Sequence, residues 1–234
     1  MKYYANWKLN KTQKEMKNYF KQFNSFAITD TDELCFFVSS CILLSTCKYS
    51  KYSIGIQNIA PAVWGAYTGE TSIEQVIECG AKFVLVGHSE RRNIFFESDD
   101  MIASKLSLLQ NYDITSVLCI GEKIDEVKQK DEVLSIQIDK ALTKLDKIEN
   151  IIIAYEPVWA IGSGLTPKTK DIEKTIKFIK KYISKKYKID LEVLYGGSVN
   201  KNNIVDLKRI KSLDGFLIGG ASLNAQDFYD LINA

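Results

Sequence analysis

Short apolar runs alternate with longer segments of helical periodicity along the whole sequence, and this alternation constrains the fold more than any other feature. Eight runs of four to six residues are strand candidates, at 3–7, 34–39, 53–57, 83–87, 115–120, 151–155, 192–195 and 215–218. Helical segments lie between most of them, which implies a parallel sheet. Eight such units predict an α/β fold in which one domain over residues 1–234 closes into a (β/α)8 barrel. A doubly wound open sheet is the alternative.

The segments between the strands carry apolar side chains on one helical face. Helices are predicted over 12–23, 98–109, 168–187 and 224–232. In the third of these, four isoleucines recur at i, i+4, i+7 and i+11, which places them on one face of a helix. Asn224 is the predicted N-cap of the last helix, because a short polar side chain there accepts from a free backbone N–H.

Composition and charge exclude several classes of protein. The chain has 31 basic and 29 acidic residues, so nothing in its charge demands a nucleic acid or a membrane surface as partner. No apolar run approaches ~18 residues, and residues 1–8 lack a signal-peptide hydrophobic region, so we expect a soluble cytoplasmic protein. The five cysteines are scattered without Cys-x-x-Cys spacing, and His88 is the single histidine. Disulfides and a multi-histidine metal site are therefore not expected.

The segment 154–164, Ala-Tyr-Glu-Pro-Val-Trp-Ala-Ile-Gly-Ser-Gly, follows a predicted strand and carries the first candidate site. Pro157 biases Glu156 toward an extended conformation, so the carboxylate is held on stiff backbone at the strand end. The segment begins with the stiff pair Pro157-Val158, continues with the large apolar side chain of Trp159 and ends in glycines. This pattern predicts a lid that moves as a unit. The lid comprises Pro157, Val158, Trp159, Ala160, Ile161, Ser163 and Gly164 around Gly162. The alternative is a plain loop with a surface glutamate.

The segment 84–92 places His88 just past another strand end. Ser89 is the predicted N-cap of a short helix that follows. Backbone amides at a helix start disfavour positive charge, so we expect His88 to be neutral and to act as a hydrogen-bond donor. A histidine satisfied by the local backbone is the alternative.

Asn6 and Lys8 lie two residues apart at the end of the first strand, so both point to the same side of it. A lysine that only meets solvent is the alternative.

Two glycine doublets follow the last two strands, Gly196-Gly197 before Ser198, and Gly219-Gly220. Glycines let backbone N–H groups approach an anion closely. In a barrel, the loops after strands seven and eight are the common phosphate site. One doublet is frequent in turns, but two at these places indicate a bound phosphate.

The order and spacing of these segments, together with the long loop after the third strand that contains Trp64 and Tyr67, resemble those of the triosephosphate isomerase family. The resemblance runs from Ala5-Asn6-Trp7-Lys8 to residues 215–223, nearly the whole chain. It implies a (β/α)8 TIM barrel that interconverts dihydroxyacetone phosphate and D-glyceraldehyde 3-phosphate through an enediol or enediolate. It implies no metal and no organic cofactor.

The resemblance also implies roles for individual residues. Glu156 would be the base that moves a proton between two carbons. Neutral His88 would polarise the carbonyl, and Lys8 would supply positive charge, the division of roles established for the family. Asn6 would hold the oxygen side of the site, and Glu90 matches a second carboxylate whose role stays open.

Two further sets of residues follow from the same resemblance. Gly162, Ser198, Gly219 and Gly220 would bind the substrate phosphate, largely through backbone amides. Thr68, in the long third loop, would reach a neighbouring subunit and complete its site, which implies a homodimer.

The chain departs from the family pattern at two places. The loop after the second strand, 38–41, lacks the proline common there. Pro167 stands where the family has a residue whose backbone N–H bonds the tyrosine corresponding to Tyr195 when the lid closes, and proline has no N–H. Our hypothesis is that closure depends more on Ser198 and on the packing of Trp159.

Two other functions remain open at this stage. One is a catalytically silent barrel that binds a phosphorylated metabolite, although a pure binder does not need Glu156 beside the reacting carbons. The other is a different aldose–ketose phosphate isomerase, although the compact lid favours a three-carbon substrate.

Overall fold

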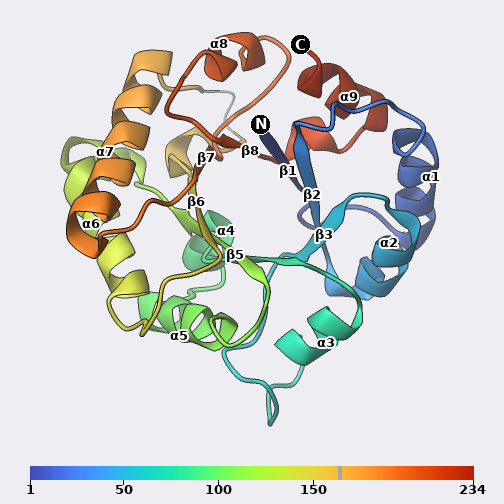
Figure 1. Cartoon of the computed structure of the whole chain (residues 1–234), viewed down its shortest axis with the longest axis horizontal. Coiled ribbons are helices and arrows are strands. Elements are labelled where there is room, and N and C mark those ends of the chain that lie inside the picture. Colours follow the sequence, from blue (N-terminus) through green and yellow to red (C-terminus); the bar gives the residue numbers. More distant parts are fainter. Residues whose placement is uncertain (163–164) are drawn as a thin grey trace.

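The computed structural model describes residues 1–162 and 165–234, so Ser163 and Gly164 of the predicted lid lie outside the described residues. Eight parallel strands close into a barrel in chain order (Figure 1). The strands are β1 (Lys2–Asn6), β2 (Glu33–Val38), β3 (Ser53–Ile56), β4 (Phe83–Val86), β5 (Thr115–Ile120), β6 (Ile151–Tyr155), β7 (Val193–Tyr195) and β8 (Gly215–Ile218). Each predicted strand is present with its bounds within one residue of the prediction.

Pairing between the first and last strands decides the architecture. In the parallel β1–β8 ladder, Lys2 pairs with Gly215 and Ala5 pairs with Ile218. An open sheet has two edge strands that pair on one side only, whereas here every strand pairs on both sides. The (β/α)8 barrel is therefore confirmed, and the doubly wound alternative is wrong.

The helices are α1 (Gln13–Phe23), α2 (Leu43–Tyr49), α3 (Ile73–Glu78), α4 (Ser89–Asn93), α5 (Asp99–Leu109), α6 (Lys130–Leu142), α7 (Thr169–Tyr187), α8 (Ile204–Lys208) and α9 (Ala225–Ile232). All of these except the short α4, which overlaps the barrel in the view of Figure 1, surround the barrel on its outer side. Short 3-10 turns are η1 (Ser40–Ile42), η2 (Ile124–Gln129), η3 (Val158–Ala160) and η4 (Gly220–Ser222). The four helices predicted from periodicity are all present.

The sequence explains where several helices begin. Thr12 caps α1 in a reciprocal capping box with Glu15. The predicted N-cap Asn224 is confirmed, because its side chain accepts from the N–H of Asp227 at 3.0 Å. In α7 the four isoleucines are buried, which fixes the face that turns toward the barrel.

Two apolar layers form the core. One fills the barrel interior and includes Tyr4, Phe37 and Leu194. The other lies between strands and helices and includes Phe36 and Ile176. Because side chains on both faces of a strand are buried, the strands read as continuous apolar runs rather than alternating ones.

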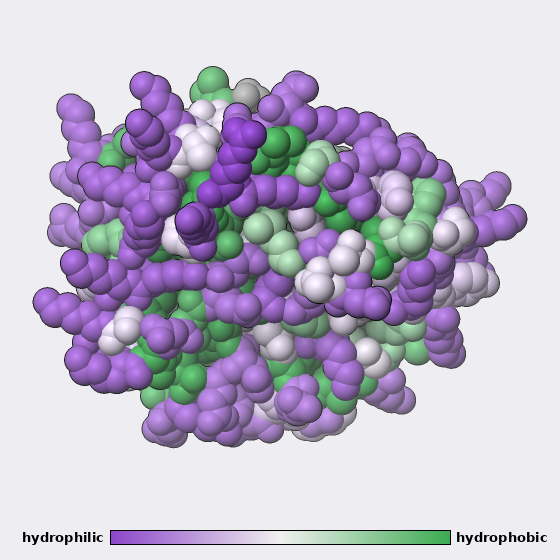
Figure 2. Space-filling model, turned by 45° about the horizontal axis from the view of Figure 1, so that its top comes forward, coloured by the Kyte–Doolittle hydropathy of each residue, from purple (hydrophilic) through white to green (hydrophobic). Residues whose placement is uncertain are grey.

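Hydrophilic side chains cover most of the face shown in Figure 2, with smaller apolar areas between them. This agrees with outer helices that turn their apolar faces inward. Within residues 1–162 and 165–234, no helix has both the length and the apolar character needed to cross a membrane.

Candidate active site

A cavity of ≈ 360 Å³ lies at the carboxyl ends of the strands. Parallel strands bring their ends together at one mouth of a barrel, so residues distant in sequence meet there. Among those that line the cavity are Asn6, Lys8, His88, Glu156, Ile161, Gly162, Ser198, Gly219 and Gly220. Most of the candidate catalytic and phosphate-binding residues are thereby brought into one cavity.

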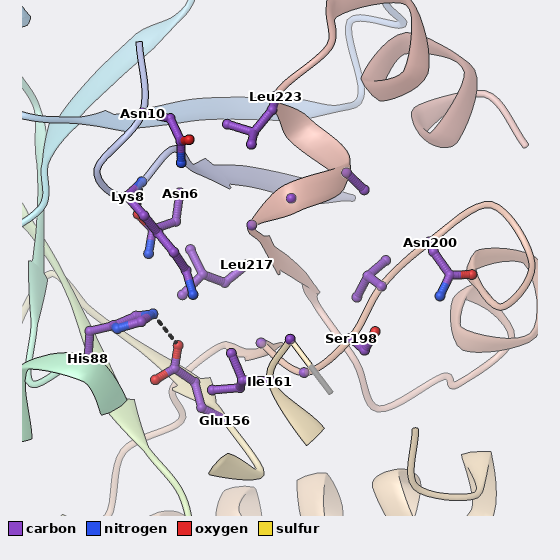
Figure 3. Close-up of a pocket in the computed structure, with 17 residues that line it drawn as sticks. Asn6, Lys8, Asn10, His88, Glu156, Ile161, Ser198, Asn200, Leu217 and Leu223 are labelled. Carbon is purple, nitrogen blue, oxygen red and sulfur yellow. Dashed lines mark hydrogen bonds and ion pairs between the residues drawn. The ribbon is translucent and has the colours of Figure 1, made fainter. Parts of the chain in front are cut away.

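Glu156 follows β6 and is almost completely buried, with 2% of its surface exposed. Its Oε1 atom lies 3.1 Å from His88 Nε2, and its Oε2 atom accepts from the backbone N–H of Ser89 at 3.0 Å (Figure 3). A Cβ atom at Gly121 would lie 1.7 Å from the Glu156 carbonyl oxygen, and one at Gly196 would lie 2.9 Å from its Cγ atom. Glycines on both sides therefore make room for this glutamate.

His88 is itself the N-cap of α4, so the prediction that Ser89 caps this helix is wrong. The imidazole Nδ1 atom accepts from the backbone N–H of Glu90 at 3.2 Å. A nitrogen that accepts a hydrogen bond carries no proton, so the proton of a neutral ring is on Nε2. That nitrogen faces Glu156, and His88 is placed as a donor into the cavity.

Lys8 adopts a left-handed backbone conformation with φ 52°. Such a conformation costs a non-glycine residue about 1–2 kcal/mol. The Lys8 N–H donates to Asn6 Oδ1 at 3.1 Å, and the Lys8 ammonium lies 2.6 Å from Glu90 Oε1. In Figure 3, the side chains of Lys8, Asn6 and His88 converge on the region of the cavity that Glu156 faces.

The glycine loops after β7 and β8 form the opposite wall (Figure 3). A Cβ atom at Gly197 would lie 2.2 Å from the Tyr195 hydroxyl oxygen, so this position requires glycine. A Cβ atom at Gly219 would lie 3.5 Å from Lys8 Cε, which shows how closely the lysine stem passes the β8 loop. Backbone amides and an ammonium group thus flank the same part of the cavity, a suitable place for an anion.

The first part of the predicted lid forms η3, and its contacts are polar as well as apolar. Trp159 Nε1 donates to Glu122 Oε1 at 3.0 Å, and the Val158 N–H donates to the Glu122 carbonyl at 3.0 Å. Tyr155 also donates to the Glu122 carboxylate, at 3.1 Å. Burial raises the pKa of Glu122, while the hydrogen bonds from Trp159 and Tyr155 oppose the rise. The tryptophan is therefore tethered to a buried carboxylate.

The tyrosine that follows the lid in the family pattern has a buried hydroxyl. Within the described ranges, the Tyr195 hydroxyl has no hydrogen-bond partner. Pro167 lies at the other end of the lid and, because it has no backbone N–H, cannot donate to the Tyr195 hydroxyl. The unpartnered Tyr195 hydroxyl and the missing N–H of Pro167 agree with the departure from the family pattern at Pro167.

Comparison with known proteins decides the family. A sequence profile described as Triosephosphate isomerase matches residues 3–234. The triosephosphate isomerase of Finegoldia magna is 39% identical to this chain, with 98% of this chain and 96% of the relative covered. That of Bdellovibrio bacteriovorus is 38% identical, with 97% and 96% covered. That of Saccharomyces cerevisiae is also 38% identical, with 98% and 96% covered.

The chain belongs to the triosephosphate isomerase family. It is therefore a member of a family of isomerase enzymes, as the resemblance of its motifs implied. The triosephosphate isomerase motifs at Asn6, His88, Glu156 and the two glycine doublets lie at or within two residues of the carboxyl ends of strands, and the barrel brings these ends together at one mouth.

Glu90, Thr68 and the first four residues of the predicted lid, 157–160, do not line this cavity. Glu90 lines a neighbouring cavity of ≈ 270 Å³, together with Lys8 and His88. Thr68 is exposed, in the loop 57–72 that projects beyond the ring of helices before α3 (Figure 1). Neither Glu90 nor Thr68 lines the main cavity.

Sequence reasoning missed several residues of the triosephosphate isomerase site. Asn10 and Leu223 line the main cavity. Gln57 lines the neighbouring one, and the sequence placed it at the start of the long third loop without assigning it a role. Glu122 accepts from Trp159, and its place two residues after β5, close to a strand end like Glu156, was an available signal. Asn10 and Leu223 lie in irregular segments, where periodicity carries no information on direction.

Proposed function

We propose that the chain interconverts dihydroxyacetone phosphate and D-glyceraldehyde 3-phosphate by proton transfer through an enediolate. The observation that carries this proposal is the 3.1 Å approach of the Glu156 carboxylate to His88 Nε2 in a cavity that also holds Lys8. A base, a neutral donor and a cation are what proton removal beside a carbonyl requires. Membership of the triosephosphate isomerase family supports the same reaction.

The reaction follows from the positions of the side chains. Glu156 takes the proton from the carbon beside the carbonyl and returns it to the neighbouring carbon. The Nε2–H of His88 donates to the oxygen that becomes negative, and the Lys8 ammonium stabilises the same charge. Asn6 lies beside Lys8 and holds the oxygen side of the substrate. A second proton passes from one oxygen to the other, because His88 gives its Nε2 proton to the old carbonyl oxygen and takes the proton of the old hydroxyl. Both protons are only relocated, so no external acid, base or reductant is consumed.

The glycine loops bind the phosphate in this proposal. Gly162, Ser198, Gly219 and Gly220 line the cavity, and in this proposal their backbone amides donate to the phosphate oxygens. The lid, from Pro157 to about residue 167, closes over the bound substrate. Exclusion of water then prevents loss of phosphate from the enediolate.

Glu90 acts through Lys8 in this proposal. Its carboxylate lies 2.6 Å from the Lys8 ammonium, and 40% of its side chain is exposed. The pair holds the ammonium beside the cavity before substrate binds. The carboxylate itself touches no substrate atom.

We also propose a homodimer in which each copy completes the other's site. Trp64 and Tyr67 in the projecting loop are 72% and 48% exposed, although both are large and apolar. The neighbouring cavity opens onto Lys8 and His88. In a two-fold dimer the loop around Thr68 of one copy fills that cavity in the other, and the contact is repeated by symmetry. Light scattering should give twice the chain mass of 26.6 kDa.

The experiment for the reaction is a coupled assay on D-glyceraldehyde 3-phosphate that compares the wild type with Glu156→Asp. This change keeps the charge but retracts the carboxylate by one methylene, and we expect kcat to fall on the order of 10²-fold. Glu132→Asp, the same change at an exposed helical position, is the matched control and should leave kcat unchanged.

Other outcomes separate the alternatives. A high rate in both the wild type and Glu156→Asp would keep the reaction but assign the base to another residue. Absence of wild-type activity would favour a silent binder, which titration with a phosphorylated ligand would then test. Faster turnover of a larger sugar phosphate would favour a different isomerase.

A further inference from the structure

Gln57, directly after β3, contacts the strained backbone of Lys8. We propose that Gln57 is a positioning residue that holds Lys8 in its left-handed conformation and thereby aims the ammonium at the substrate. The inference rests on the proposed role of Lys8 in the reaction. Strained backbone at a functional site persists only when neighbouring groups hold it.

The contacts of Gln57 reach two separate segments. Its Nε2 atom donates to the Lys8 carbonyl at 2.9 Å and to the Phe37 carbonyl at 3.1 Å. One side-chain amide therefore ties the turn after β1 to the end of β2. Both of its hydrogens are used, so the direction of the amide is fixed.

Lys8 is held on both sides by side chains. Asn6 Oδ1 accepts from the Lys8 N–H at 3.1 Å, and Gln57 donates to the Lys8 carbonyl. In the part of the chain that the structure describes, Gln57 is the donor to the Lys8 carbonyl, whereas the Phe37 carbonyl also accepts from the Trp7 N–H at 3.1 Å. Loss of the Gln57 amide would therefore affect Lys8 most.

The backbone conformation of Lys8 determines where its ammonium lies. The stem passes close to Gly219, and the ammonium lies 2.6 Å from Glu90. Relaxation to a right-handed or extended conformation would redirect the Cα–Cβ bond and carry the ammonium away from the cavity. Displacement of a catalytic group by about 1 Å can cost on the order of 10²-fold in rate.

The test compares Gln57→Leu with Gln110→Leu. Leucine has similar size and no donor. Gln110 is a matched control, because its Nε2 atom donates to the Glu149 carbonyl at 3.0 Å, far from the cavity. We expect Gln57→Leu to lower kcat/KM by about 10- to 100-fold, whereas Gln110→Leu should stay within about twofold of the wild type. If Gln57→Leu does not fold, as judged by circular dichroism, Gln57→Met replaces it.

A double-mutant cycle separates positioning from a purely structural role. The ligand is 2-phosphoglycolate, a two-carbon phosphorylated carboxylate that resembles the enediolate, and the readout is its Kd. Added to the wild type, Gln57→Leu should weaken binding about tenfold. Added to the Lys8→Met variant, the same change should weaken binding by less than about twofold, because Gln57 acts through Lys8. Equal effects in both backgrounds, or none in the wild type, would overturn the proposal.

Two further outcomes are distinguishable. Because Gln57 lines the cavity at the proposed dimer contact, activity is measured over a range of protein concentrations. A loss that disappears at high concentration would assign Gln57 to assembly and overturn the positioning role. An inactive wild type would refute the proposed reaction, and a Lys8→Met variant with full activity would refute the role of Lys8 in it. In both cases the Kd cycle would still test the coupling of Gln57 to Lys8.

Discussion

A buried ion pair between Lys105 on α5 and Glu97 gives a quantitative test of the energetics of this barrel. Each side chain is 1% exposed, and Lys105 Nζ lies 2.9 Å from Glu97 Oε1. The same ammonium donates to Asn58 Oδ1 at 2.7 Å, and Arg91 Nε donates to Glu97 Oε2 at 2.9 Å. Burial lowers the pKa of Lys105, and the charge of Glu97 opposes this change.

The perturbation is Lys105→Met, which keeps the length of the side chain and removes its charge. Removal of one partner from a buried ion pair costs about 3–5 kcal/mol, since the other charge stays buried. Glu97 retains Arg91, so we expect the lower end, about 3 kcal/mol. For a chain of this size each kcal/mol lowers Tm by roughly 2–4 °C, which gives a fall of about 6–12 °C.

The assay is urea unfolding at one fixed protein concentration, because assembly shifts apparent stability by mass action. Lys140→Met is the matched control: Lys140 pairs with Asp99 at 3.0 Å, but its side chain is 57% exposed. An exposed pair contributes about 0–1 kcal/mol. The double variant Lys105→Met with Glu97→Leu removes both buried charges and should be more stable than Lys105→Met alone.

Two results would refute this reasoning. The first is a loss for Lys105→Met no larger than that for Lys140→Met, which would mean that water reaches the pair. The second is a double variant whose loss equals the sum of the two single losses, since residues in direct contact should not be additive.

Three further perturbations test the surroundings of the site. Gly121→Ala places a Cβ atom 1.7 Å from the Glu156 carbonyl oxygen, so we expect lower kcat and lower Tm, and wild-type values of both would contradict the close approach. Burial raises the pKa of Glu122 from 4.5, so the native state binds a proton more readily than the unfolded state. The free energy of unfolding should therefore fall as pH rises from about 4.5 through the raised pKa. Glu122→Gln should abolish this slope in urea titrations at several pH values, and an unchanged slope would exclude Glu122 as its source. Pro167→Ala restores a backbone N–H at the end of the lid, so lid exchange or kcat should change, and identical values of both would count against a role for this proline in closure.

Much of the fold could be read from the sequence for a specific reason. Strands buried on both faces appear as continuous apolar runs, and β5, β6 and β8 have the predicted bounds. The isoleucine spacing of α7 and the capping residue Asn224 are equally local signals. The N-cap of α4 was mispredicted, because the imidazole Nδ1 of His88 accepts the Glu90 N–H in the way that a serine hydroxyl does.

The amino-acid sequence by itself determined the order of strands and helices, and it placed Glu156, His88 and the glycine doublets directly after strands. These features depend on residues close together in the chain, where periodicity and backbone preferences act. Tertiary structure alone decided that β1 pairs with β8 and that Gln57 reaches Lys8, 49 residues away. Such contacts depend on the register and closure of the whole barrel, and no local pattern encodes either property.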